Sequence, residues 1–316
     1  MPVHRNRAGR APPAAGAHRT APRRDSPEAD PEDTDEAAEA AEPVEIVTTV
    51  VAEGLEVPWG IDFLPDGRAL VGERDSGRIL AVEPDSGAVE EVQQLPIEPA
   101  GEGGLLGLAL SPTYEDDELI YTYRTTGEGN VVERFRPGEE PETVLGGIPA
   151  GSIHNGGRIA FGPDDLLYVT TGDAAEAQLA QDPESPAGKI LRLQPDGEPA
   201  PGNPFGNAVY SLGHRNVQGL AWTEDGALYA SEFGSDQADE VNRIEPGENG
   251  WPEVEGFGGG GEYLDPVEAY EPAEASPSGA AILRDSAIPQ WDGNFFMAAL
   301  RGERLWRLEL DDEGGL

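Results

Sequence analysis

The chain has no cysteine, a single lysine (Lys189) and only four histidines among 316 residues. Without cysteine it can form no disulfide, bind no metal through thiolates and use no cysteine nucleophile, while the redox compartment stays open. No apolar stretch approaches the roughly 18 residues that a membrane-spanning helix needs. The basic N-terminus is not followed by the apolar segment of a signal peptide. We therefore expect no membrane span.

Positive charge is also scarce, because 61 acidic residues face 21 basic ones and the formal net charge is -40. Such a chain repels nucleic acid and anionic membranes, so neither is expected as a partner. An acidic surface of this kind is typical of halophilic proteins, since concentrated salt screens the self-repulsion. Residues 1–43 are basic at first and then acidic and rich in Ala and Pro. We predict a disordered tail there, followed by one domain over residues 44–316.

From Glu45 onward the chain is rich in Gly and Pro, with short strand-like runs and no helical periodicity. One unit recurs: a Pro-Asp-Gly-type turn, an apolar strand, a second turn and another strand. The five copies span Phe63–Gly87, Leu110–Gly138, Phe161–Gly197, Trp222–Pro252 and Trp291–Gly315. Turn residues between apolar runs indicate hairpins. Recurrence every ~45–65 residues predicts an all-β propeller. The alternative, a β-sandwich, requires no such recurrence.

The number of blades follows from how propellers close. The fifth copy reaches the last residues of the sequence, and the early segment Glu45–Leu55 reads as a strand without a blade of its own. Propellers remove their exposed edges by pairing the first and last strands. We therefore expect a six-bladed architecture with about five blades present and the last one missing, and Glu45–Leu55 as a candidate closing strand.

His154 directly precedes the first strand of the third unit and is followed by Asn155, Gly156 and Gly157. Loops at one end of a propeller channel converge, so a histidine in such a loop faces a bound ligand. An imidazole is suited to take a proton from a hydroxyl group, and adjacent glycines let a flat molecule approach the backbone. The alternative is a histidine that only forms hydrogen bonds with neighbouring loops.

A second polar loop, Tyr210–Trp222, gathers His214, Arg215, Asn216 and Gln218 before a strand. An arginine is a strong donor to carboxylates and carbonyls, and the two amides add orienting hydrogen bonds. The alternative is a hydrogen-bond network that holds adjacent blades together, a role that suits His214.

Two more segments carry candidate ligands. Ser231–Pro252 offers Asp236, Asp239, Glu240 and several turn carbonyls, which are the hard oxygens that Ca²⁺ prefers. Its spacing is not that of an EF-hand, and carboxylate clusters arise by chance in so acidic a chain. Glu102 stands before two glycines at the entry to a strand, where the alternative is a packed turn with a solvated carboxylate. No lysine follows these glycines, so a phosphate-binding loop is excluded.

Taken together in this order, the segments resemble the soluble pyrroloquinoline quinone (PQQ)-dependent sugar dehydrogenases of the glucose/sorbosone dehydrogenase family. The resemblance runs from about Val47 onward and is carried by EGGLLGLALSP, HNGGRIAFGPDDLLYVTTGD, GKILRLQPDG, LGHRNVQGLAW, SEFGSDQADEVNRI, NGWP, SPSGAA and ALRGERLWRL. It implies a six-bladed propeller that oxidises aldoses at the anomeric carbon to lactones. It also implies PQQ and Ca²⁺ as cofactors, an external electron acceptor and an extracellular or cell-surface location.

The resemblance assigns roles to individual residues. It makes His154 the general base for the anomeric hydroxyl, and Arg215 the group that contacts the quinone carbonyls and stabilises developing negative charge. The implied cofactor contacts are Glu102, His154, Arg215, Asn216, Gly234, Ser235 and Arg301. The implied metal ligands are the carbonyls of Gly234 and Ser235 at one Ca²⁺ and, at a second Ca²⁺, Glu240 with a carbonyl at Asn249.

The chain also departs from the family pattern. Ser235 replaces a usual proline, and Ile153 stands where some glucose-specific members have an aspartate, so a glucose preference is not expected. The Arg-x-Arg-Asp segment of the family's last blade is absent, which predicts weak cofactor binding and leaves open whether this chain is active. Two other functions stay open: a non-catalytic propeller that binds a ligand at the same channel mouth, and a Ca²⁺-dependent hydrolase of lactones or esters, which the two histidine loops fit less well.

Overall fold

The computed structural model describes residues 44, 46–311 and 314–315. Residues 46–311 belong to one compact unit. The tail predicted over residues 1–43 lies outside the described residues, so that prediction is untested.

The first two sheets each contain four antiparallel strands in chain order. Blade 1 comprises β1 (Pro58–Phe63), β2 (Ala69–Glu73), β3 (Arg78–Val82) and β4 (Val89–Gln94). Blade 2 comprises β5 (Leu105–Leu110), β6 (Ile120–Thr126), β7 (Gly129–Phe135) and β8 (Glu142–Ile148), with the short helix α1 (Tyr114–Asp117) between its first two strands.

The other three sheets continue the pattern with small variations. Blade 3 comprises β9 (Ile159–Phe161), β10 (Leu167–Thr170), β11 (Lys189–Leu193) and β12 (Val209–Leu212), to which β16 (Gly247–Glu248) adds in parallel, and the 3₁₀ helix η1 (Ala177–Gln181) connects β10 with β11. Blade 4 comprises β13 (Val217–Trp222), β14 (Leu228–Glu232), β15 (Asp239–Ile244) and β17 (Glu268–Tyr270). Blade 5 comprises β18 (Pro277–Ile282), β19 (Phe295–Ala299) and β20 (Arg304–Leu308), with the 3₁₀ helix η2 (Pro289–Trp291) before β19.

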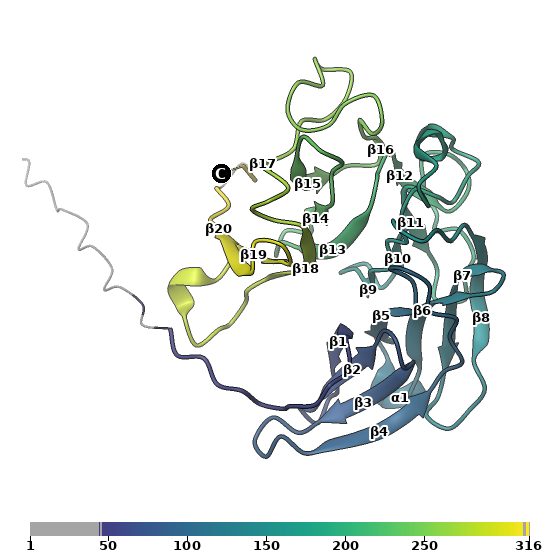
Figure 1. Ribbon diagram of the computed structural model, residues 1–316, viewed down its shortest axis with the longest axis vertical. Coiled ribbons are helices and arrows are strands. Elements are labelled where there is room, and N and C mark those ends of the chain that lie inside the picture. The colour runs from purple at the N-terminus through teal and green to yellow at the C-terminus, as the bar shows by residue number, and fades with distance from the viewer. Residues whose placement is uncertain (1–43, 45, 312–313, 316) are drawn as a thin grey trace, which may run out of the picture. The chain divides into compact units, whose positions relative to one another are not determined.

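Within residues 46–315 the five sheets fan out around a common centre, with the first strand of each blade innermost (Figure 1). The inner strands contact one another from blade to blade, as β1 contacts β5, β5 contacts β9 and β13 contacts β18. The predicted all-β propeller is therefore confirmed, with five blades in the part of the chain that the structure describes.

Each blade begins one strand earlier than the repeated sequence unit. In blade 1 the turn at Pro65–Gly67 joins β1 to β2, and Gly67 has the left-handed φ of +91° that favours glycine. The Gly67 N–H donates to the Leu64 carbonyl at 2.8 Å and the Leu64 N–H to the Arg68 carbonyl at 2.8 Å. The conspicuous turn thus marks the middle of an inner hairpin, so the inner strand precedes it.

The apolar core lies between adjacent blades. One cluster joins β5, β6 and β7 of blade 2 to blade 3, with Leu106, Tyr123 and Ile159 all at 2 % exposure or less. Similar clusters lie between blades 1 and 2, blades 3 and 4, and blades 4 and 5. Blades 2, 3 and 4 each take part in two of these clusters and blades 1 and 5 in one, and burial between sheets is why the strands are apolar in nearly continuous runs.

The strand expected over Glu45–Leu55 was a wrong prediction, because residues 46–55 contain no strand. Val47 and Val50 are 80 % and 72 % exposed. β-branched residues favour an extended backbone, but a strand forms only where a neighbour pairs with its N–H and C=O groups. No described strand lies beside this segment to supply those bonds.

Candidate active site

His154 lies in the loop between β8 and β9, in a left-handed backbone conformation with φ of +59°. Its N–H donates to Glu102 Oε2 at 2.8 Å, and its Nδ1 lies 2.7 Å from Asp173 Oδ1. A left-handed backbone costs a non-glycine residue roughly 1–3 kcal/mol, and such residues concentrate at functional sites. Glu102 therefore acts on the His154 backbone, in a loop that enters β5 as the sequence predicted.

Asp173, which the sequence reasoning did not single out, orients the imidazole. It follows β10, and its Oδ1 also accepts the Ala175 N–H at 2.8 Å while Oδ2 accepts the Trp251 indole N–H at 2.9 Å. A carboxylate only accepts hydrogen bonds, so Nδ1 of His154 carries a hydrogen, and in the neutral ring Nε2 then has the lone pair. The signal in the sequence was its place at the end of the motif HNGGRIAFGPDDLLYVTTGD, three residues after the strand LYVT.

The loop of His154 and the loop of Asp173 approach each other closely, which brings the two side chains together. A Cβ atom at Gly172 would lie 1.8 Å from the His154 carbonyl oxygen, so only glycine fits there. Gly172 also pairs with Asn216 in an isolated bridge, and Asn216 Oδ1 accepts the Gly156 N–H at 2.9 Å. Asn216 thereby joins the predicted arginine loop to the predicted histidine loop.

Arg215 lies beside the histidine pair. Its carbonyl accepts the Asp173 N–H at 2.8 Å, and its guanidinium donates to the Phe233 carbonyl at 3.2 Å. The guanidinium carbon lies 5.5 Å from the centroid of the Trp251 ring, whose N–H binds Asp173. The structure thus brings the loops of His154 and Arg215 together on one rim of the propeller.

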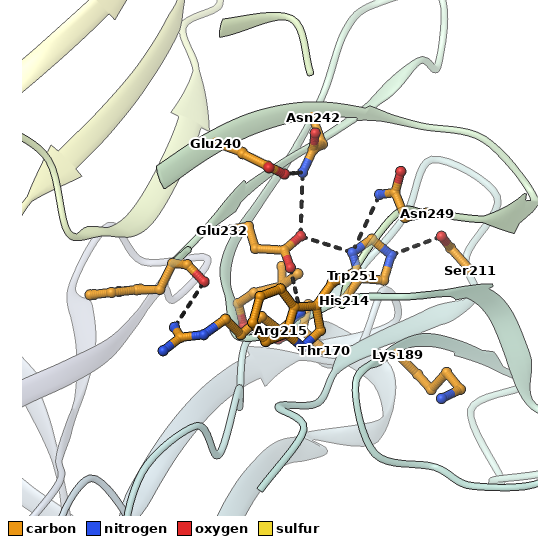
Figure 2. Close-up of polar contacts among 12 residues, drawn as sticks. Thr170, Lys189, Ser211, His214, Arg215, Glu232, Glu240, Asn242, Asn249 and Trp251 are labelled. Atoms are coloured by element: carbon orange, nitrogen blue, oxygen red, sulfur yellow. Dashed lines mark hydrogen bonds and ion pairs between the residues drawn. The ribbon is translucent and has the colours of Figure 1, made fainter. Parts of the chain in front are cut away.

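Behind Arg215 lies a buried network centred on Glu232 (Figure 2). Glu232 Oε1 accepts the Arg215 N–H at 2.5 Å, and Oε2 accepts from Asn242 at 3.3 Å and lies 2.9 Å from His214 Nδ1. The other nitrogen of His214 lies 2.8 Å from Ser211 Oγ. Because both ring nitrogens are bonded and the side chain is fully buried, His214 has the network role that was its alternative in the sequence.

Arg301 joins Arg215 near a buried carboxylate. Burial raises the pKa of Asp239, and the positive charges of Arg215 and Arg301 act in the opposite direction. Asp239 is tied to its surroundings by the N–H groups of Gly234 at 2.9 Å and Ser276 at 2.6 Å. Two guanidinium groups therefore lie within electrostatic reach of one carboxylate at this end of blades 4 and 5.

Gly234 and Ser235, which are predicted to hold a metal through their carbonyls, lie in the turn between β14 and β15. A Cβ at Gly234 would lie 1.6 Å from the Ala238 carbonyl oxygen, so the turn closes only with glycine there. Among the described residues, no N–H or side chain donates to the carbonyl oxygens of Gly234 and Ser235. Both oxygens thus have lone pairs free for another ligand.

Glu240 and Glu232 lie directly opposite each other on β15 and β14. Burial first and the charge of Glu232 second raise the pKa of Glu240 to about 7. Both glutamates and Asn249 line one cavity of about 20 Å³. Over the described ranges, no group of three or more His, Asp or Glu side chains is placed to hold a metal ion, so a site here would need backbone or amide oxygens in addition to these two carboxylates.

A central cavity of about 1190 Å³ is lined by β1, β5, β9 and β18 together with Glu102 and Phe233. Arg158 reaches into it, stacked 4.2 Å from the centroid of the Trp59 ring and donating to the Gln218 carbonyl at 2.8 Å. Burial lowers the pKa of Arg158 to about 10. Sequence reasoning gave this positive charge no role. None of the helices in the described part of the chain is long and apolar enough to cross a membrane.

A family model described as glucose/sorbosone dehydrogenase matches residues 55–315. The chain belongs to the glucose/sorbosone dehydrogenase family. The resemblance seen in the sequence motifs is thereby confirmed.

Relatives agree with this assignment. Quinoprotein glucose dehydrogenase B of Acinetobacter calcoaceticus is 34 % identical over 251 residues, which cover 66 % of this chain and 52 % of that protein. Aldose sugar dehydrogenase YliI of Escherichia coli is 28 % identical over 83 % of this chain and 80 % of its own length. The PQQ-bound structure of aldose sugar dehydrogenase from Streptomyces coelicolor superposes with a TM-score of 0.80 at 50 % identity, covering 85 % of this chain and 82 % of that one. This chain therefore falls within a family of oxidoreductases.

Proposed function

We propose that this protein oxidises aldose sugars at the anomeric carbon to lactones, with PQQ as cofactor, and passes the electrons to an external acceptor. The observation that carries the proposal is the His154–Asp173 pair, held at 2.7 Å, on the same rim as Arg215. The names of the relatives support the substrate class, and the PQQ-bound Streptomyces coelicolor structure supports the cofactor. On the family resemblance we also propose that the protein acts outside the cytoplasm.

His154 would act as the general base. Asp173 holds Nδ1, so Nε2 presents its lone pair and takes the proton from the anomeric hydroxyl. Asp173 also stabilises the imidazolium that this transfer creates. The Glu102 carboxylate fixes the His154 backbone at 2.8 Å and lines the central cavity, where it has reach to sugar hydroxyl groups. The protein thus supplies a base of fixed direction.

The cationic side chains suit a quinone that carries carboxylates. When bound, PQQ supplies the quinone that accepts the hydride from the sugar carbon. Arg215, stacked on Trp251, offers a flat donor surface to quinone oxygens, and Arg301 adds a second guanidinium. Asn216 keeps the two loops together. These residues fit the cofactor in charge and in hydrogen-bonding capacity.

We also propose two Ca²⁺ sites. The unbonded carbonyls of Gly234 and Ser235 are hard oxygen ligands beside Arg215, which suits a cation that polarises the cofactor. The carboxylates of Glu232 and Glu240 face each other, and burial first and the charge of Glu232 second raise the pKa of Glu240; a divalent cation, also held by the Asn249 carbonyl, would offset both effects. The second site would be structural.

The direct test is reconstitution of the protein with PQQ and Ca²⁺ and measurement of dye reduction with a panel of aldoses. We expect turnover with several sugars, without a preference for glucose, and none with His154→Gln. PQQ binding without turnover on any sugar would favour a non-catalytic binding propeller. A thermal shift with Ca²⁺ that is lost in Glu240→Gln would support the structural metal site, and an unchanged shift would refute it.

A further inference from the structure

Trp251 contacts both halves of the site. Its indole N–H donates to Asp173 Oδ2 at 2.9 Å, and its ring lies 5.5 Å from the guanidinium carbon of Arg215. Figure 2 shows the Trp251 ring next to Arg215, in front of the buried network. Asp173 in turn holds Nδ1 of His154. The indole therefore contacts Arg215 directly and His154 through Asp173.

The indole is itself held firmly. The backbone N–H of Trp251 donates to the Gly213 carbonyl at 3.0 Å, and the backbone carbonyl of Trp251 accepts from Gln181 Nε2 at 2.7 Å. Gln181 ends η1, and the same amide also binds the Asn249 carbonyl at 2.9 Å. A side chain whose backbone is fixed at both N–H and C=O is well placed to fix its neighbours.

The two oxygens of Asp173 divide their bonds unequally. Oδ1 accepts from His154 and from the Ala175 N–H, and Oδ2 accepts from the indole. Without the indole, no other donor in the described part of the chain reaches Oδ2, and the carboxylate would be freer to rotate. Its rotation would turn the imidazole, since Nδ1 follows Oδ1.

We propose that Trp251 is a positioning residue that aligns the His154–Asp173 pair with Arg215. The indole N–H sets the direction of the base through Asp173, and the ring face sets the plane of the guanidinium. This inference rests on the proposed function, in which His154 is the base and Arg215 binds the cofactor.

Two substitutions separate the two contacts. Trp251→Phe keeps an aromatic face under Arg215 but removes the N–H, and should lower kcat by about tenfold, since a hydrogen bond to a charged group contributes about 1.5 kcal/mol or more. The Kd of PQQ for the apoprotein, measured by calorimetric titration, should change less than about twofold. Trp251→Leu should lower kcat similarly and also weaken PQQ binding by about two- to fivefold, the size of an exposed cation–π contact.

A double-mutant cycle distinguishes positioning from general loss of structure. In an Asp173→Asn background, Trp251→Phe should cause no further loss of kcat, because its effect passes through the missing carboxylate. Losses that multiply in the double variant would overturn the proposal, as would wild-type kcat in Trp251→Phe.

Trp306 provides the matched control. Its indole N–H donates to the Glu274 backbone carbonyl at 3.2 Å, and the Arg304 guanidinium carbon lies 5.2 Å from the centroid of its ring, so it has the same two kinds of contact with other partners. Trp306→Phe should leave kcat and PQQ binding unchanged, and a tenfold loss there would contradict the proposal.

A measurement without turnover keeps this inference separate from the proposed function. The NMR signal of the His154 Nδ1–H proton should shift in Trp251→Phe and stay in place in Trp306→Phe. If the wild type oxidises no aldose while this signal responds as expected, the dehydrogenase function is rejected and the positioning contact stands. An unmoved signal would reject the contact itself.

Discussion

The protein contains two histidine–carboxylate pairs that are similar in geometry and different in surroundings. His154 Nδ1 lies 2.7 Å from Asp173, and His214 Nδ1 lies 2.9 Å from Glu232. The side chain of His154 is 11 % exposed at the rim, whereas that of His214 is fully buried and its second nitrogen is bonded to Ser211. The two histidines therefore differ at Nε2: in His154 this nitrogen is available to react, whereas in His214 it is bonded within the fold.

The same distinction applies to the sole lysine. Lys189 is fully buried, and its ammonium donates to the carbonyls of Leu179, Ala180 and Ala187 at 2.8, 2.9 and 2.6 Å. All three N–H donors of the ammonium are bonded, just as both ring nitrogens of His214 are. The accepting carbonyls belong to η1 and the segment that follows it. Lys189 thereby anchors the helix whose Gln181 holds Trp251. A buried charged group thus supports the site indirectly, by holding the helix that positions one of its side chains.

The largest expected effect comes from removing the reactive member of the first pair. His154→Gln should reduce kcat by about 10²- to 10⁴-fold, the range for a positioned general base. PQQ binding and the thermal unfolding temperature serve as controls and should change little, since Gln still fills the loop. A variant that keeps the wild-type rate would show that the base is elsewhere.

Replacing the buried histidine should have the opposite profile. His214→Phe keeps the ring but removes both nitrogens, which should lower the free energy of unfolding by about 2–3 kcal/mol through loss of a charge-assisted hydrogen bond. Urea titration measures this loss, and kcat of the folded variant should fall far less than in His154→Gln. A 100-fold loss of kcat without loss of stability would make His214 the functional histidine instead.

Lys189→Met should destabilise the fold somewhat less, by about 2 kcal/mol. Ala180 O still accepts the Gly213 N–H at 2.8 Å and Leu179 O the Asp182 N–H at 3.2 Å. Among the described donors, only Lys189 reaches the Ala187 carbonyl, and one buried unsatisfied acceptor costs about 1–3 kcal/mol. Urea unfolding of the variant measures the loss. An unchanged free energy of unfolding would mean that water replaces the ammonium.

The sequence allowed the propeller to be predicted because its signals are local. Pro-Asp-Gly turns, apolar strands and their recurrence need no knowledge of distant contacts. His154, Arg215 and Glu102 were likewise recognisable from the short motifs around them. The Val-rich segment at residues 46–55 shows the limit, since its strand propensity is local but a strand also requires a partner.

Asp173 and Trp251 were missed for a related reason. Their hydrogen bond joins residues 78 positions apart, in two different blades' connecting loops. The closing of those loops depends on bonds such as that from Gln181 to Trp251, which no motif marks. Asp173 and Trp251 both stand in motifs of the family resemblance, but those motifs do not show that the two side chains meet.

The smallest expected effect is the pH dependence that Lys189 gives to stability. Burial lowers its pKa to about 8 from 10.5 in the unfolded chain, so between these pH values the folded chain binds fewer protons. The free energy of unfolding should then rise with pH in this window, by less than about 1.4 kcal/mol per pH unit. Lys189→Met should lack this rise, and the difference between the two urea titration series from pH 8 to 10 isolates it from other groups. If the two series of unfolding free energies run parallel with pH, the three carbonyls compensate the burial of the ammonium and the lysine is as readily protonated in the folded chain as in the unfolded one.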